Sequence, residues 1–140
     1  MGFKLAIDSM SVPFIGRGIA LVIGMESRGF IFGAAVADRL SAGFVPVRKP
    51  GKLPWQTIRA SYDLEYGADS LEMHGDSVVS GQRVLIVDDL LATGGTANAT
   101  VNLVKQLGGT IEGVSFLIEL VALNGRARLA GENVHAVLQY

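Results

Sequence analysis

One stretch of the sequence, VLIVDDLLATGGT at residues 84–96, constrains the fold more than any other. It opens with a run of β-branched and aliphatic residues, which predicts a strand buried on both faces of a parallel sheet. Two carboxylates, Asp88 and Asp89, follow at once, and Gly94-Gly95 then leads into apolar residues at helical spacing. A strand, a glycine-containing loop and a helix in this order are typical of the α/β class, in which ligands bind at the carboxyl ends of parallel strands.

The rest of the chain repeats this alternation of strands and helices. Short apolar runs predict buried strands at residues 19–25, 44–47, 83–87, 114–120 and 134–138. Helical periodicity predicts helices at residues 3–10, 30–40 and 96–107. Mixed segments at 58–64 and 70–74 predict an antiparallel hairpin around the turn Tyr66-Gly67-Ala68-Asp69. We therefore expect one α/β domain over residues 1–140, with a central, mainly parallel sheet flanked by helices.

Composition narrows the classes of function. The absence of cysteine excludes disulfide scaffolds, zinc ribbons and cysteine nucleophiles, and it fits a cytoplasmic protein. The net charge of −1 argues against a nucleic-acid partner. No apolar run approaches the roughly 18 residues that span a bilayer, so we expect no membrane partner. The mean hydropathy of +0.39 is high for a small domain and indicates apolar surface buried in a partner, which favours a homodimer.

The loop at residues 92–96 has the chemistry of a phosphate cradle. Its glycines let backbone N–H groups converge, its threonines add hydroxyl donors, and the following helix supplies free N–H groups and a positive dipole end. Asp88 and Asp89 would repel a bare phosphate, but they suit sugar hydroxyls or a Mg²⁺ ion that bridges hydroxyls and diphosphate. Neither GxxxxGK[ST] nor GxGxxG occurs in this loop. The residues therefore predict a phosphorylated sugar as ligand.

The thirteen residues VLIVDDLLATGGT, at positions 84–96, resemble the phosphoribosyl-diphosphate signature of the type I phosphoribosyltransferases. Three further segments resemble the adenine phosphoribosyltransferases in particular, namely GMESRGFIFG at residues 24–33, VPVRKPGKLP at 45–54 and YDLEYG at 62–67. All four motifs occur in family order. The resemblance implies the type I phosphoribosyltransferase fold, with a flexible β-hairpin hood at about residues 49–76. It also implies transfer of the phosphoribosyl group from phosphoribosyl diphosphate (PRPP) to adenine, giving AMP and diphosphate.

The resemblance further implies which residues hold the diphosphate. Glu26, Ser27 and Arg28 match the family's diphosphate loop, where a non-proline cis peptide occurs, and the corresponding bond is Glu26–Ser27. Arg28 suits bidentate phosphate contact. Lys49 matches a diphosphate ligand, and Arg48 matches a basic residue with a role across a dimer interface in relatives.

The sugar and the base are assigned in the same way. The residues expected to hold the 5′-phosphate are Ala92, Thr93, Gly94, Gly95 and Thr96. Asp88 and Asp89 are the expected ribose-binding acids, in contact with Mg²⁺ directly or through water. Glu65 matches a carboxylate that manages a proton on the purine, and Tyr66 matches an aromatic residue of the hood near the reacting groups. A hood that closes would keep water from an oxocarbenium-like sugar.

Alternatives stay open at this point. A sister enzyme could use xanthine or hypoxanthine and guanine, although YDLEYG and RKPGKLP favour adenine. A PRPP-sensing regulator of transcription is a second alternative, but such proteins carry an added DNA-binding domain. Family members have a further N-terminal segment with an aromatic-arginine-aspartate motif that helps to form the adenine pocket. This sequence does not contain it, so a PRPP-binding form with weakened base affinity is a third alternative.

Overall fold

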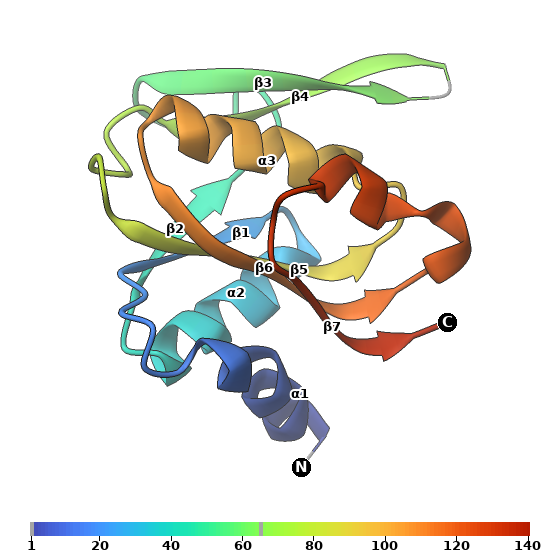
Figure 1. The fold of residues 1–140 in the computed structure, drawn as a ribbon. Coiled ribbons are helices and arrows are strands. Elements are labelled where there is room, and N and C mark those ends of the chain that lie inside the picture. Colours follow the sequence, from blue (N-terminus) through green and yellow to red (C-terminus); the bar gives the residue numbers. More distant parts are fainter. Residues whose placement is uncertain (1, 65) are drawn as a thin grey trace.

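The computed structural model of the chain describes residues 2–64 and 66–140. Five parallel strands form its central sheet in the order β2-β1-β5-β6-β7 (Figure 1). These strands are β1 (Leu21–Met25), β2 (Gly43–Val47), β5 (Arg83–Leu91), β6 (Thr110–Glu119) and β7 (Val134–Gln139). All five core strands predicted from the sequence are present, which confirms the α/β class and the parallel sheet.

Helices cover both faces of this sheet. They are α1 (Gly2–Ser11), α2 (Arg28–Arg39) and α3 (Gly95–Gln106). Val84 and Ile86 of β5 belong to the core on the side of α3, whereas Leu85 and Val87 belong to the core on the side of α1 and α2. Because side chains alternate between the two faces of a strand, a strand covered on both faces is apolar throughout. This double coverage explains the continuous apolar run at the start of β5.

The strand order reverses between β1 and β5, which are neighbours at the centre of the sheet. From β1 the chain passes through α2 to β2, on one side of the pair, and from β5 it passes through α3 to β6, on the other side. Open α/β sheets bind ligands at the carboxyl ends of the strands where the order reverses in this way. The loops at residues 26–27 and 92–94 flank this position, so the topology alone brings together the two anion loops predicted from the sequence.

A separate two-stranded antiparallel sheet lies over α3, and Figure 1 shows it as a long hairpin. It consists of β3 (Thr57–Leu64) and β4 (Gly67–His74). The predicted hairpin is confirmed, but its strands pair further toward the tip than expected. Leu64 pairs with Gly67, so Asp69 belongs to β4 and not to the turn. Leu71 and Met73 point into the core, which fixes the face that the hairpin presents to α3.

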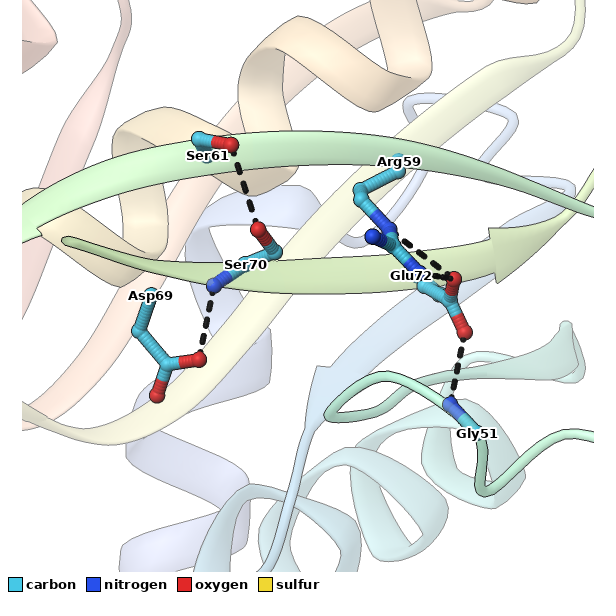
Figure 2. Close-up of polar contacts among 6 residues, drawn as sticks. All are labelled: Gly51, Arg59, Ser61, Asp69, Ser70 and Glu72. Carbon is cyan, nitrogen blue, oxygen red and sulfur yellow. Dashed lines mark hydrogen bonds and ion pairs between the residues drawn. The ribbon is translucent and has the colours of Figure 1, made fainter.

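The base of the hairpin is fastened by the buried carboxylate of Glu72 (Figure 2). Arg59 donates to its Oε2 from Nε and Nη2 at 3.1 and 2.8 Å, and the N–H of Gly51 donates to its Oε1 at 3.0 Å. The hydrogen bonds from Gly51 and Arg59 hold the pKa of Glu72 below its ordinary value. Backbone hydrogen bonds between Glu72 and Arg48 join β4 to the end of β2. The hairpin is therefore anchored at its base and projects toward its tip.

Several features differ from the sequence-based expectations. β5 continues through the two aspartates to Leu91, because β6 pairs with it along that whole length. Three short 3₁₀ helices were not predicted, namely η1 (Val12–Phe14), η2 (Val121–Leu123) and η3 (Gly125–Leu129). In the part of the chain that the structure describes, no helix has the length and apolar character to cross a membrane.

η3 is held in place by Glu119, a carboxylate at the end of β6 that is only 3% exposed. Arg126 donates from Nε to both of its oxygens at 3.0 and 2.8 Å, and Gln139 donates from Nε2 at 2.9 Å. Arg126 also donates from Nη1 to the carbonyl of Val134 at 3.1 Å. These bonds tie η3 to β6 and β7, the two strands at one edge of the sheet.

We expect Glu119→Gln to lower the free energy of unfolding at pH 7 by about 1–3 kcal/mol, because a buried charge-assisted pair is broken. The hydrogen bond from Arg126 lowers the pKa of Glu119 in the folded state. The contribution of ionised Glu119 to the free energy of unfolding is therefore complete above its pKa in the unfolded state, about 4.3. This contribution is lost as the pH falls through the lower pKa of the folded state. Urea unfolding of the parent and of Glu119→Gln should show a difference in the free energy of unfolding that narrows below about pH 4. Glu112→Gln, which breaks a more exposed pair with Arg83 at 3.7 Å, is the control and should cost under about 1 kcal/mol.

Candidate functional site

The first anion loop follows β1 and leads directly into α2. The peptide bond between Glu26 and Ser27 is cis, as the family resemblance implies, and α2 begins at Arg28. The start of α2 packs closely on β5, because a Cβ atom on Gly29 would lie 2.8 Å from Oδ1 of Asp88. Glycine at this position therefore lets the first anion loop approach the carboxylates of the second motif.

The pKa values of the two aspartates near the end of β5 are shifted in opposite directions. Burial, and then the neighbouring carboxylate of Asp89, raise the pKa of Asp88. Burial also acts to raise the pKa of Asp89, but hydrogen bonds from Arg28 and Asp88 outweigh it and hold that pKa below its ordinary value. Arg28 donates from Nε to Oδ2 of Asp89 at 2.5 Å. The pair thus offers both a hydrogen-bond donor and an acceptor, which suits neighbouring sugar hydroxyls.

Glu26 links the first anion loop to the basic segment after β2. Its Oε1 accepts the N–H of Lys49 at 2.7 Å and lies 3.3 Å from Nε of Arg48. The guanidinium of Arg48 also lies over the ring of Phe30, 5.8 Å from its centroid. The ammonium of Lys49 lies 3.7 Å from Oδ2 of Asp69 on the hairpin. Lys49 is therefore fixed at its backbone by one carboxylate and paired at its side chain with another.

The first anion loop, Lys49 and the two aspartates line a cavity of about 260 Å³, which we call the acidic cavity. Seven of its lining residues were predicted site residues, namely Glu26, Ser27, Arg28, Lys49, Asp88, Asp89 and Thr96. The cavity therefore brings together two cations and the carboxylate pair from three separate segments of the sequence.

The second anion loop, residues 92–94, connects β5 to α3. Gly94 has a φ of +87°, which favours glycine, and it precedes the first residue of α3. The first N–H groups of α3 have no acceptor within the helix and face outward at its positive end. Together with Tyr62, Asp63 and Leu64 of β3, the loop lines a cavity of about 190 Å³, which we call the cradle cavity. Ala92, Thr93, Gly94, Gly95 and Thr96 all line this cavity.

Tyr62 contacts both cavities and was not singled out from the sequence. It lines both of them, as do Leu90 and Thr96. Its ring lies against the cradle, since Cδ2 is 3.5 Å from the position of a Cβ on Gly95, and its hydroxyl donates to Asp69 at 3.4 Å. Burial raises the pKa of this phenol. The inward alternation of β3 was the signal that could have identified it.

The tip of the hairpin lies apart from the acidic cavity. Tyr66 is 89% exposed and lines a third cavity of about 450 Å³ with Asp63, Leu64, Thr93 and Arg128. Arg128 had no role in the sequence analysis. Glu65, the predicted proton-managing carboxylate, lies outside the described residues.

Comparisons with known proteins agree with this arrangement. The family model described as "Phosphoribosyl transferase domain" matches residues 5–132. The adenine phosphoribosyltransferase of Acidobacterium capsulatum is 58% identical over 139 residues, which cover 99% of this chain and 77% of that protein. The enzyme of the same name from Koribacter versatilis is 57% identical over 140 residues, which cover 100% of this chain and 77% of that protein.

Solved structures lead to the same family. The crystal structure of adenine phosphoribosyltransferase from Rhodothermus marinus matches with a TM-score of 0.95 and 56% identity, covering 98% of this chain and 78% of that one. The Saccharomyces cerevisiae enzyme, solved in complex with an imino-altritol bisphosphate and adenine, matches with a TM-score of 0.89 and 40% identity, covering 96% and 78%. The chain belongs to the adenine phosphoribosyltransferases, which transfer the 5-phosphoribosyl group of PRPP to adenine and release AMP and diphosphate.

Proposed function

We propose that the two cavities divide PRPP between them. The 5′-phosphate binds to residues 92–96 in the cradle cavity, and the diphosphate binds beside Arg28 and Lys49 in the acidic cavity. The ribose lies between them, with its hydroxyls on Asp88 and Asp89. The observation that carries this proposal is the carboxylate pair flanked by two anion loops at the reversal of strand order. PRPP is a single sugar with a phosphate at one end and a diphosphate at the other, which matches a carboxylate pair with an anion loop on each side.

The acidic cavity fits a Mg²⁺ ion shared with the substrate. Asp88 and Asp89 supply carboxylate oxygens, which are ligands that Mg²⁺ prefers. Across residues 2–64 and 66–140, no group of three or more His, Cys, Asp or Glu side chains comes together as a metal site. Two carboxylates suit an ion that also keeps water and substrate oxygens around it. When bound, Mg²⁺ would neutralise charge on the diphosphate.

The cations of the acidic cavity are already paired with carboxylates. Arg28 contacts Asp89, and Lys49 lies near Asp69. A diphosphate would take over as partner of both cations, and its negative charge grows as the bond to C1′ breaks. Glu26 and Ser27 complete the loop, and Arg48 acts toward a second subunit. This exchange releases Asp89 toward the ribose hydroxyls.

In the reaction, N9 of adenine forms a bond to C1′ while the bond from C1′ to the diphosphate oxygen breaks. The N9 proton must leave the purine, and we assign its management to Glu65, with Tyr66 beside the reacting groups. The hairpin supplies the cover that keeps water away from the sugar cation. The protein contributes orientation and electrostatic stabilisation.

We further propose that residues 1–140 act as one cytoplasmic domain that assembles into a homodimer. Large apolar side chains are exposed on α1, η1, the residue after η1 and α2, namely Phe3, Leu5, Val12, Ile15 and Ile31. Burial of such side chains against a second copy would be favourable. Sedimentation equilibrium should therefore give twice the mass of the chain, and a monomer at micromolar concentration would contradict this assembly.

The assignment of the diphosphate to the acidic cavity predicts the effect of Lys49→Ala. Loss of one charge-assisted contact should weaken binding of magnesium diphosphate about 10- to 100-fold, measured by isothermal titration calorimetry. Binding of ribose 5-phosphate should stay unchanged, because that ligand lacks the diphosphate. Lys52→Ala is the matched control, since Lys52 is exposed in the same basic loop and does not line the acidic cavity. Equal losses in the two variants would contradict the assignment.

A further inference from the structure

η3 packs against the loop of the phosphate cradle, although the chain places 30 residues between them. The contact is between backbones. A Cβ atom on Gly94 would lie 2.6 Å from the carbonyl oxygen of Gly125, and a Cβ on Gly125 would lie 2.5 Å from the carbonyl oxygen of Ala92. Glycine on both sides therefore allows η3 to pack directly on the loop. Side chains of η3 are held at a fixed position relative to the cradle.

One of these side chains, Arg128, reaches the start of α3. Its Cβ lies 3.3 Å from the position of a Cβ on Gly94, and its Nη1 lies 3.4 Å from the position of a Cβ on Gly95. Gly95 is the first residue of α3. Arg128 also lines the 450 Å³ cavity together with Thr93 of the loop. Its guanidinium thus lies beside the start of α3, in a cavity that shares Asp63, Leu64 and Thr93 with the cradle cavity.

This placement brings two positive groups together. The N-terminal end of α3 carries a partial positive charge, and a cation beside it is unfavourable unless an anion lies between them. The other arginine of η3 shows the contrast, since Arg126 is turned to the sheet and donates to Glu119 and to the carbonyl of Val134. Within one short helix, one arginine has a structural carboxylate partner and the other faces the cradle. An anion shared by Arg128 and the start of α3 accounts for this arrangement.

We propose that Arg128 binds the 5′-phosphate of PRPP and of AMP, from outside the signature loop. The inference rests on the proposed location of that phosphate in the cradle cavity. The loop and the start of α3 supply backbone N–H and hydroxyl donors, and Arg128 supplies the full positive charge that a phosphate dianion requires. Arg128 is then a substrate-binding residue, and η3 is part of the substrate site.

The test is isothermal titration calorimetry of ribose 5-phosphate, AMP and magnesium diphosphate with the full chain. Arg128→Ala should weaken binding of ribose 5-phosphate and AMP about tenfold or more, because a charge-assisted contact is lost. Binding of diphosphate should not change. The affinity of Arg128→Lys for ribose 5-phosphate and AMP should lie between those of the parent and of Arg128→Ala, since lysine keeps the charge without the planar fork. Arg17→Ala, which removes the same charge before the amino end of β1, is the control and should bind all three ligands as the parent does.

Two results would overturn the inference. One is equal binding of ribose 5-phosphate by the parent and by Arg128→Ala. The other is an equal loss for all three ligands, which would indicate a structural role for Arg128. If the parent chain itself fails to bind ribose 5-phosphate while it binds diphosphate, the proposed cradle is wrong, and that failure is distinct from a failure of Arg128 alone.

Discussion

Replacing both Asp88 and Asp89 with asparagine is expected to lower kcat for AMP formation by about 10³-fold or more, because both carboxyl groups that would hold the ribose and Mg²⁺ are removed together. The fold should remain intact, since asparagine has nearly the same size and shape as aspartate. Burial already raises the pKa of Asp88, so a neutral amide should be tolerated there. The melting temperature of the double variant should stay close to that of the parent, since the amide at position 88 is tolerated and the pair lost between Arg28 and Asp89 is partly exposed.

Initial rates of AMP formation, with saturating substrates and Mg²⁺, measure this effect. Asp76→Asn is the matched control, because Asp76 is an exposed carboxylate that follows β4 and lies outside both the acidic cavity and the cradle cavity. It should leave kcat unchanged. Full activity of the double variant would show that the carboxylates hold neither the sugar nor the metal in the productive complex.

Gly94→Ala has the second large expected effect. The φ of +87° at Gly94 strains any residue with a side chain, and the added Cβ would lie 2.6 Å from the carbonyl oxygen of Gly125. Either the cradle or η3 must then move. We expect the free energy of unfolding to fall by about 2–4 kcal/mol and the affinity for ribose 5-phosphate to fall at least about 100-fold.

A matched control separates backbone strain from the steric clash. Gly131 has a similar φ of +89°, but no atom lies within 4 Å of the position of its Cβ. Gly131→Ala should therefore cost only the backbone strain, about 1–2 kcal/mol, and should bind ribose 5-phosphate as the parent does. Unchanged binding by Gly94→Ala would mean that the close packing of η3 on the loop is not needed for the phosphate site.

The sequence predicted those parts of the fold that local patterns determine. The apolar runs identified the five core strands, because strands covered on both faces are apolar throughout. The carboxylates of Asp88 and Asp89 and the glycines after β5 pointed to a sugar phosphate before any fold was known. The hairpin was predicted, but its length was underestimated, since Gly67 and Asp69 have low strand propensity and pair only because β3 continues opposite them.

Contacts between distant segments could not be predicted from local patterns. η3 was missed because residues 125–129 show no periodicity and are held by a carboxylate of β6. The pairing of Lys49 with Asp69 joins the basic loop to the hairpin, and nothing in either segment alone indicates it. Arg128 reaches the cradle only because Gly94 and Gly125 allow two backbones to meet. These contacts depend on the tertiary structure, and Asp69, Gly125 and Arg128 lie outside all four sequence motifs.

The most direct test is an assay of nucleotide formation from PRPP and Mg²⁺ with adenine, hypoxanthine, guanine and xanthine supplied separately. We expect AMP and diphosphate in equal amounts from adenine, and little or no nucleotide from the other three bases. Binding of PRPP without any nucleotide product, or nucleotide formed from another base but not from adenine, would contradict this expectation.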